Sequence, residues 1–274
     1  AEIAANTEVG KLLSAEAEFD LEKAAAMKAA AEGGGPKPKA PPTEPNSFGM
    51  RVGKGKKGAS KDYFNFASCF EPLCAETPEG EKLREDGFLQ ADPNGNGLCS
   101  LAELETFVLK ALLAKFPNAG KGKELKTPGQ DMWKAFRPCY IRAFKDAADY
   151  AKDEGKVIEG TKSAKQDDFV DKKEFRLFCV YVIIYACMFD AFAKIDGGGS
   201  GRDANDDKRI EEQEWLQGYL NISNYGFVAF DGVDDKKAAK KAWKQMDDNG
   251  GGIVLVDEWC WFIKQAEVAA GTEA

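Results

Sequence analysis

The sequence predicts an all-α protein, and three observations carry this prediction. From Thr77 onwards, apolar residues recur at the three- and four-residue spacing of amphipathic helices, as in MWKAFRPCYIRAF and EQEWLQGYL. Helix-start signals precede two such segments: Thr77 with Pro78, and Thr127 with Pro128 and Gln130, the second being typical of a capping box. No convincing strand-like run or hairpin turn indicates a larger β-sheet.

The composition favours a globular protein that binds cations rather than nucleic acid. The chain has 274 residues and 43% hydrophobic content, enough for one large domain or two small ones with a core. Acidic residues number 46 against 38 basic ones, so the formal net charge is −8. Because phosphate binding needs a basic surface, we expect no nucleic-acid partner, and hard cations become more plausible ligands.

The absence of histidine and the placement of the cysteines exclude several classes of enzyme and metal site. The chain contains no histidine, which excludes triads with a histidine base and zinc sites with a histidine ligand. Its 7 cysteines form no CxxC pair and mostly stand among apolar residues, as reduced core thiols of an intracellular protein do. No pair of nucleophile and base emerges, so we expect that the protein is not an enzyme.

Residues 1–60 are predicted to form an extended arm outside the helical part. The segment 33–45, GGGPKPKAPPTEP, is too rich in glycine and proline for a helix, and no signal peptide is expected ahead of it. A GxGxxG match at 53–58 follows no apolar strand, so we interpret it as a basic tether. The arm is suited to contact a protein partner or an anionic membrane. Its basic residues for that contact are Lys54, Lys56, Lys57 and Lys61.

The stretch DPNGNGLCSLAE at residues 92–103 has the pattern of a calcium-binding loop between two helices, an EF-hand. Such a loop places oxygen ligands at positions 1, 3, 5, 7, 9 and 12, with a backbone carbonyl at 7, glutamate at 12 and glycine at 6. Gly97 stands at position 6. The predicted ligands are Asp92, Asn94, Asn96, the Leu98 carbonyl, Ser100 and Glu103. A polar turn between helices is the alternative interpretation.

The same pattern recurs in DANDDKRIEEQE at residues 203–214, which we expect to bind calcium most tightly because it is richest in acids. Its predicted ligands are Asp203, Asn205, Asp207, the Arg209 carbonyl, Glu211 and Glu214. Lys208 stands at position 6, where a left-handed backbone costs roughly 1 kcal/mol. The preceding IDGGGSGR also resembles the start of a loop, with Asp196 at position 1; it lacks acids at positions 3 and 5, so we interpret it as an insertion.

A further predicted site is DDNGGGIVLVDE at residues 247–258, with Gly252 at position 6. Its predicted ligands are Asp247, Asn249, the Ile253 carbonyl and Glu258. Positions 5 and 9 are Gly251 and Leu255, which offer no side-chain oxygen, so this site is expected to bind more weakly. The three sites together predict about three calcium ions at saturation.

A fourth copy, SAKQDDFVDKKE at residues 163–174, is expected to be structural, because Lys165 at position 3 repels a cation. EF-hands pack in pairs through the residues at position 8, which predicts antiparallel pairing of Cys99 with Val170 and of Ile210 with Val254. The predicted domains are the arm, 1–60, and two EF-hand lobes, 61–178 and 179–274. The apolar stretch 178–193 is shorter than a membrane span and is expected to form a buried helix joining the lobes.

The C-terminal half resembles the calflagins, a family of flagellar calcium-binding proteins, over about residues 130–270. The resemblance is carried by EFRLFCVYVIIYACMFDAFAKIDGGGSGRDANDDKRIEEQEW, by NYGFVAF and by MDDNGGGIVLVDEWCWFIKQAEVAA. It implies an intracellular, calcium-responsive protein on the cytoplasmic side of a flagellum or cilium, with active third and fourth hands. The first hand is predicted from its own residues alone.

Two functions follow from these expectations. In a calcium sensor or calcium-regulated scaffold, ion binding opens a helix pair and exposes an apolar groove for a partner, here expected to be cytoskeletal or axonemal. The alternative is a structural EF-hand component of a larger assembly, anchored through its N-terminal arm. A calcium buffer, whose sites bind without opening, is a third possibility.

Overall fold

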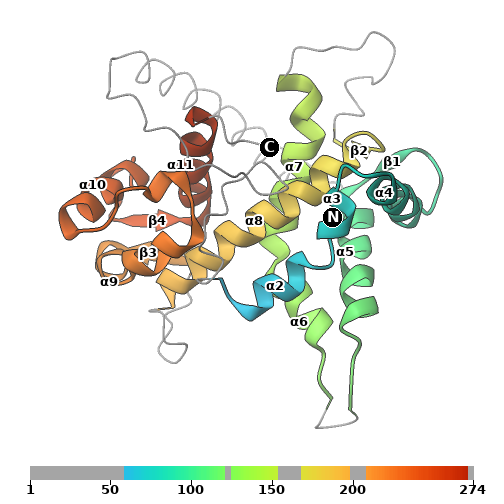
Figure 1. Cartoon of the computed structure of the whole chain (residues 1–274), viewed down its shortest axis with the longest axis horizontal. Helices are drawn as coiled ribbons and strands as arrows, with labels where there is room; N and C mark the ends of the chain where they lie inside the picture. Colours follow the sequence, from blue (N-terminus) through green and yellow to red (C-terminus); the bar gives the residue numbers. More distant parts are fainter. Residues whose placement is uncertain (1–58, 121–124, 154–167, 198–207, 271–274) are drawn as a thin grey trace, which may run out of the picture. The chain divides into compact units, whose positions relative to one another are not determined.

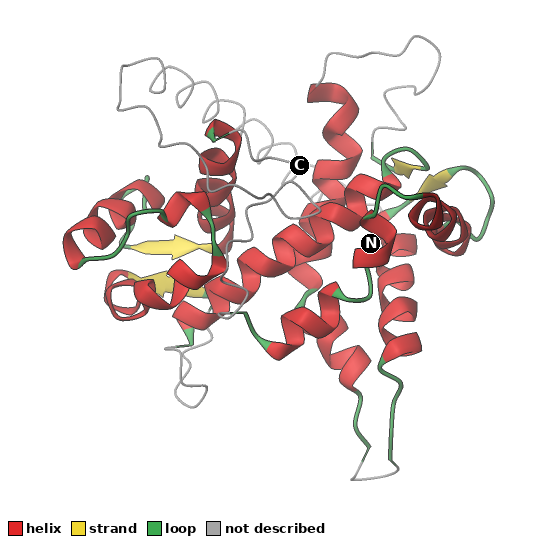
Figure 2. Cartoon of the chain, in the orientation of Figure 1, coloured by secondary structure: helices red, strands yellow, loops and turns green. Residues whose placement is uncertain are grey.

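The computed structural model describes residues 59–120, 125–153, 168–197 and 208–270. These residues are mostly helical, which confirms the predicted all-α class; the strands among them are short (Figures 1 and 2). The predicted arm lies almost wholly outside the described residues. The elements before the central helix are α2 (Lys61–Ala67), α3 (Glu71–Cys74), α4 (Pro78–Ala91), β1 (Leu98–Cys99), α5 (Leu101–Lys115), α6 (Pro128–Ala135), α7 (Arg137–Asp153) and β2 (Val170–Asp171). From the central helix on they are α8 (Phe175–Asp196), β3 (Arg209–Glu211), α9 (Glu212–Ile222), the 3₁₀ turns η3 (Ser223–Tyr225) and η4 (Val228–Phe230), α10 (Lys236–Met246), β4 (Ile253–Leu255) and α11 (Val256–Ala269).

Helix α8 is the element against which much of the described chain packs. It is 22 residues long, and its neighbours include α2, α3, α7, α9 and α11 (Figure 1). Its length and mean hydropathy of 1.8 would suit a membrane span, yet 78% of its apolar window is buried inside the protein. This agrees with the predicted buried helix. The predicted boundary at residues 178 and 179 falls inside α8, and residues 42–274 form one compact unit, so the division into two lobes remains a prediction.

Both predicted strand pairs are present in the predicted register. Strand β1 pairs antiparallel with β2, and Cys99 lies opposite Val170. Strand β3 pairs antiparallel with β4, and Ile210 lies opposite Val254. All four of these side chains are fully buried. Each pair therefore ties together two loops that are far apart in the sequence.

Aromatic side chains fill the core around both strand pairs. On the β1–β2 side, Phe175 at the start of α8 meets Phe107 of α5 with ring centroids 5.3 Å apart. On the β3–β4 side, Trp215 of α9 and Trp259 of α11 are fully buried, with centroids 6.3 Å apart. Each buried indole N–H is satisfied, since Trp215 donates to the Ala239 carbonyl at 2.8 Å and Trp259 to that of Met188 at 2.9 Å.

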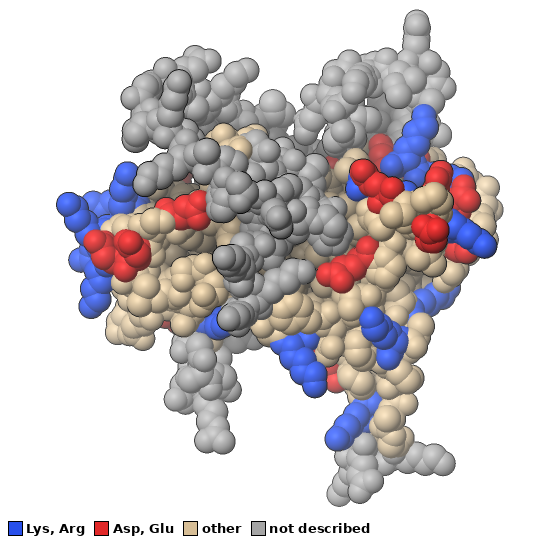
Figure 3. All heavy atoms as spheres, viewed as in Figure 1, with Lys and Arg blue, Asp and Glu red and all other residues tan. Residues whose placement is uncertain are grey.

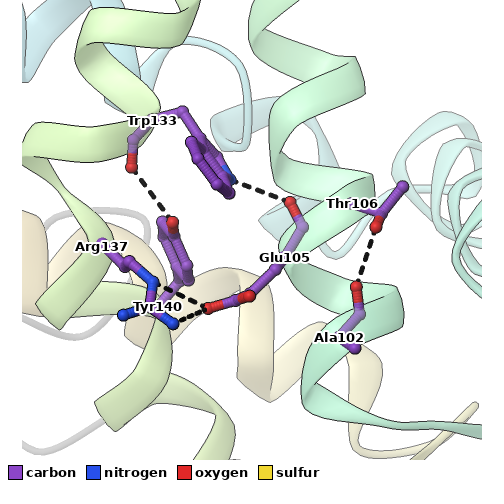
Figure 4. A network of polar contacts seen from close by, with 6 residues as sticks. All are labelled: Ala102, Glu105, Thr106, Trp133, Arg137 and Tyr140. Atoms are coloured by element: carbon purple, nitrogen blue, oxygen red, sulfur yellow. Dashed lines mark hydrogen bonds and ion pairs between the residues drawn. The ribbon is translucent and has the colours of Figure 1, made fainter.

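Helix α5 is held against α6 and α7 by a polar network (Figure 4). The Trp133 indole N–H donates to the Glu105 carbonyl at 3.0 Å, and the Tyr140 hydroxyl donates to the Trp133 carbonyl at 3.1 Å. The Glu105 carboxylate accepts from the Arg137 guanidinium at 3.1 Å. These contacts fix α5, which follows the first predicted loop, to the next helical segment.

One of the two predicted helix caps is correct and the other is wrong. Thr77 Oγ1 accepts from the Gly80 amide at 3.1 Å, as expected of an N-cap. Thr127 precedes α6 but forms no capping box with Gln130. Its hydroxyl donates instead to the Asp131 carboxylate, at 3.1 Å to Oδ1. The carboxylate one residue beyond Gln130 is the stronger acceptor, which the spacing pattern did not weigh.

Candidate metal centre

The loop between α4 and α5 closes around the carboxylate of Asp92. Asp92 follows the last residue of α4 and is only 7% exposed. Its Oδ2 accepts from the Gly97 amide at 2.8 Å, and its Oδ1 from the Asn96 amide at 3.2 Å. Gly97 has φ of +79°, as predicted for position 6, and this left-handed turn points its amide back at Asp92.

Glu103 closes the other end of this loop. As the third residue of α5 it forms a capping box with Ser100: its Oε2 accepts from the Ser100 amide at 2.8 Å and hydroxyl at 2.7 Å. Its Oε1 accepts from the Asn94 side-chain amide at 2.7 Å. The side chains at positions 3, 9 and 12 therefore form one connected cluster, and the Asn96 amide, which donates to both Asn94 Oδ1 and Asp92 Oδ1, links it to position 1. Asn96 Oδ1, at position 5, accepts from the Leu98 amide at 2.8 Å.

The loop between α10 and α11 repeats this arrangement. Asp247 Oδ2 accepts from the Gly252 amide at 3.0 Å, and Gly252 has φ of +78°. Glu258 Oε2 accepts from the Leu255 amide at 2.9 Å, and Glu258 Oε1 accepts from the side-chain amide of Asn249. The predicted ligands of the two loops thus occupy corresponding places, although their sequences differ at positions 5 and 9.

In loop 247–258, one carboxylate oxygen lacks a hydrogen-bond donor among the described residues. Asp247 Oδ1 is buried and has no hydrogen-bond partner among the described residues. It lies near the backbone of Gly251, 4.0 Å from where a Cβ on that glycine would stand, so it faces the inside of the loop. A buried carboxylate oxygen without a partner is costly unless a hydrogen-bond donor or a cation reaches it. This orphaned atom fits a cation held by the loop.

The predicted loop 203–214 is described only in its second half. Asp203, Asn205 and Asp207 lie outside the described residues. Arg209 is in β3, where its carbonyl is the predicted ligand, and Glu214 Oε2 accepts from the Glu211 amide at 2.9 Å, as the position-12 glutamate does in the other loops. Lys208 has φ of +62°, the left-handed conformation predicted at position 6.

The described part of this loop also brings in Asp196, which the sequence pattern had assigned to an insertion. The Lys208 amide donates to Asp196 Oδ2 at 3.1 Å, the same contact that Gly97 makes to Asp92 and Gly252 to Asp247. Asp196 is the last residue of α8 and only 2% exposed. A signal for its role is in the sequence: like Asp92 and Asp247 it directly follows a buried apolar residue at the end of a helix.

The described part of the fourth copy, 163–174, is its glutamate end. Ser163 and Lys165 lie outside the described residues. Glu174 Oε2 accepts from the Asp171 amide at 2.9 Å, while Asp171 Oδ1 accepts from the Glu174 amide at 2.9 Å. Glu174 is 6% exposed. The copy therefore retains the turn that feeds β2 into α8, in agreement with its predicted structural role.

The predicted sites offer oxygen ligands of mixed type. Within the described residues, no group of three or more His, Cys, Asp or Glu side chains is gathered as for a metal ion. In loops 92–103 and 247–258 only one aspartate and one glutamate face inward, and the other candidates are amides, a hydroxyl and backbone carbonyls. Carboxylate and carbonyl oxygens suit Ca²⁺ or Mg²⁺ rather than Zn²⁺ or copper.

The pKa of Cys99 reflects its burial and the negative charges in loop 92–103. Burial, followed by the negative charges of Asp92 and Glu103, raises the pKa of its thiol to about 12. Exposed lysines lie on the solvent face of α10: Lys236, Lys237, Lys240, Lys241 and Lys244 (Figure 3). Within loop 247–258, Asp257 pairs with Arg142 of α7.

Comparison of the chain with models of known protein families gave no match, and comparison with curated proteins gave none either. The contacts described above, together with the residue patterns, are therefore the basis for a function.

Proposed function

We propose that the protein binds calcium through three EF-hand loops, which end at Glu103, Glu214 and Glu258. The observation that carries this proposal is the repeated closure of the loops. In each, the amide at position 6 donates to an aspartate at the end of the preceding helix, at 2.8, 3.1 and 3.0 Å in chain order. In each, the amide at position 9 donates to the position-12 glutamate, at 2.8, 2.9 and 2.9 Å.

This closure supports calcium binding because it brings the loop oxygens toward one centre. A calcium ion takes six to eight oxygen ligands, and a glutamate at position 12 supplies two of them. Asn94 and Asn249 donate to that glutamate in the first and last loops. A bound ion would be held by the amide oxygens of Asn94 and Asn249 and by both carboxylate oxygens of the glutamate. The chain's part is to hold Asp92, Asp196 and Asp247 in place beforehand.

As the more specific role, we propose a calcium sensor or calcium-regulated scaffold in a flagellum or cilium. The location rests on the resemblance to calflagins. Opening requires apolar surface that ion binding can release, and the C-terminal part holds such surface: Trp215, Tyr219, Phe227, Trp243 and Trp259 are all buried. The partner is proposed to be a cytoskeletal or axonemal protein, with the arm contacting it or an anionic membrane. The structural component remains the second candidate, because the strand pairs and aromatic core are compatible with a closed module.

Titration calorimetry of the whole chain with Ca²⁺ tests the binding proposal. We expect about three ions per chain, with Glu103→Gln and Glu258→Gln each removing one. The matched control is Glu85→Gln, which changes an exposed helix residue that forms a surface ion pair with Lys172. An unchanged stoichiometry in Glu103→Gln, or no heat of binding in the wild type, would refute it.

An apolar dye separates the sensor from the structural component. A sensor should gain dye fluorescence when Ca²⁺ is added, and Glu258→Gln should reduce the gain. A structural module or a buffer should bind the ions with no gain in dye fluorescence.

A further inference from the structure

Ser60 forms hydrogen bonds with the side chain of Asp190, which lies far away in the sequence. Ser60 is exposed and stands directly before α2. Its amide donates to Asp190 Oδ2 at 2.8 Å, and its hydroxyl donates to Asp190 Oδ1. Asp190 belongs to α8 and also accepts from the Tyr225 hydroxyl at 2.7 Å. One carboxylate thus holds the start of α2 with both of its oxygens.

This contact fixes a helix that covers part of the aromatic core. Tyr63 and Phe66 of α2 are 4% and 0% exposed. The Phe66 ring stacks on Phe136 with centroids 4.4 Å apart. Helix α2 packs on α8, next to α6 (Figure 1). The Ser60–Asp190 contact is therefore the polar end of an otherwise apolar docking of α2.

Basic residues surround Ser60 in the sequence, as they do in the substrates of basic-directed protein kinases. Lysines stand three and four residues before it, at Lys57 and Lys56, and Lys61 follows it. Kinases of this kind recognise their substrates through acidic residues that pair with lysine or arginine ahead of the acceptor serine. The proposed calcium binding does not use any of these residues.

We propose that Ser60 is a phosphorylation site and that its phosphorylation undocks α2 from α8. The kinase transfers the γ-phosphoryl group of ATP to Ser60 Oγ. The hydroxyl proton passes to the kinase, and ADP leaves. The product carries a charge of about −1.5 to −2 at neutral pH where a neutral hydroxyl had donated to Asp190.

The geometry makes this modification incompatible with the docked helix. Phosphoserine has no hydroxyl to donate, and its charge faces the carboxylate that the hydroxyl had contacted. The Tyr225 hydroxyl also donates to Asp190 Oδ2, so the carboxylate is not free to turn away. Two like charges in contact repel one another, which lowers the stability of the docked state relative to the undocked one. Because a kinase needs an extended substrate, it acts on the transiently undocked α2, and phosphorylation then holds that state.

The test treats the whole chain with Mg·ATP and a purified basic-directed serine/threonine kinase, locates phosphate by mass spectrometry and follows hydrogen exchange of residues 61–67. We expect phosphate on Ser60 and exchange in α2 that is faster by about tenfold or more, since a hydrogen bond to a charged group is replaced by repulsion. Ser60→Ala should remove the phosphate and leave exchange in the kinase-treated sample at its untreated rate.

Ser60 is also the N-cap of α2, where its Oγ accepts from the Tyr63 amide at 3.0 Å, and two further variants separate the proposed mechanism from simple loss of this cap. Asp190→Asn should speed phosphorylation of Ser60, because α2 undocks more often, and it should shrink the effect of phosphate on exchange, because the repelling charge is gone. Glu85→Gln, on an exposed face of α4, should change neither. Failure of the kinase to modify Ser60 would overturn the proposal. So would a phosphorylated chain in which α2 exchanges as slowly as before, or an Asp190→Asn variant that responds to phosphate as the wild type does.

Discussion

The backbone amide of Lys208 donates to Asp196 Oδ2 at 3.1 Å, across a stretch of twelve residues. In the two loops of ordinary length the same contact spans five residues, from Gly97 to Asp92 and from Gly252 to Asp247. Loop 203–214, the third loop in chain order, therefore shows the same closing contact as the other two. By this contact Asp196 takes the place that Asp92 and Asp247 hold in their loops, whereas counting back from Glu214 assigns position 1 to Asp203.

Asp196→Asn is accordingly expected to weaken calcium binding at the third loop by about tenfold or more, because a charged ligand at position 1 becomes neutral. Asp203→Asn should have the smaller effect. Both changes are best made in a Glu103→Gln, Glu258→Gln background, so that calorimetry reports one site. A circular dichroism melt shows whether the buried Asp196 position still folds. The opposite ranking would restore Asp203 to position 1.

Lys208→Gly is expected to stabilise the protein by about 1 kcal/mol, since lysine at φ of +62° carries a left-handed strain that glycine does not. Affinity at the third loop should rise or stay the same, because the amide that meets Asp196 is kept. Urea unfolding of the calcium-free chain measures the effect. Lys208→Ala is the matched control and should bring no gain, because alanine shares the strain. Equal stabilities of the two variants would show that the turn is unstrained.

The strand pairs and loop turns could be predicted because they depend on local spacing. Cys99 opposite Val170 and Ile210 opposite Val254 follow from counting to position 8 in each loop, and the left-handed Lys208 follows from counting to position 6. Such positions have one geometrical solution once the loop type is chosen. The spacing of oxygen-bearing side chains and glycines in the sequence identifies the loop type.

The role of Asp196 and the contacts between helices could not be predicted in this way. A glycine-rich insertion hides Asp196 from any fixed spacing, and only the folded backbone shows which aspartate the Lys208 amide meets. Arg142 and Asp257 form an ion pair although they are 115 residues apart. Pairings of this kind depend on how α7 and α11 pack, and no local pattern reports that.

Asp146→Ala is expected to destabilise the protein by about 2 kcal/mol. Asp146 accepts from Lys264 of α11 at 2.6 Å and from the hydroxyl of the buried Tyr185 of α8, so its removal leaves a buried donor unpaired. Asp146→Asn should cost less because an amide oxygen can still accept. Urea unfolding gives both values, with Glu85→Gln as a surface control that should stay within about 0.5 kcal/mol of wild type. A loss no larger than that control would mean that water replaces Asp146.

Stability is expected to fall steadily as the pH rises above about 9, and the buried thiols are the cause. Burial raises the pKa of Cys74 and of Cys260 to about 12, from an ordinary value of 9.0, and raises that of Cys139 well above 9.0. These folded-state values are raised, so the stabilisation is fully present below pH 9 and is lost as the pH approaches the folded pKa. In that range the unfolded chain releases thiol protons that the folded chain keeps.

The expected loss is roughly 1.4 kcal/mol at pH 10 for each such thiol. Buried tyrosines act in the same direction at higher pH, since burial, followed by the charge of Asp190, raises the pKa of Tyr225. Urea unfolding at pH 7, 8, 9 and 10 under a phosphine reductant measures the slope. Cys260→Ala should reduce the dependence of the unfolding free energy on pH by the contribution of one thiol. Cys69→Ala, which removes a half-buried thiol, should reduce it less. A free energy of unfolding that is the same at pH 8 and pH 10 would show that these thiols reach water in the folded chain.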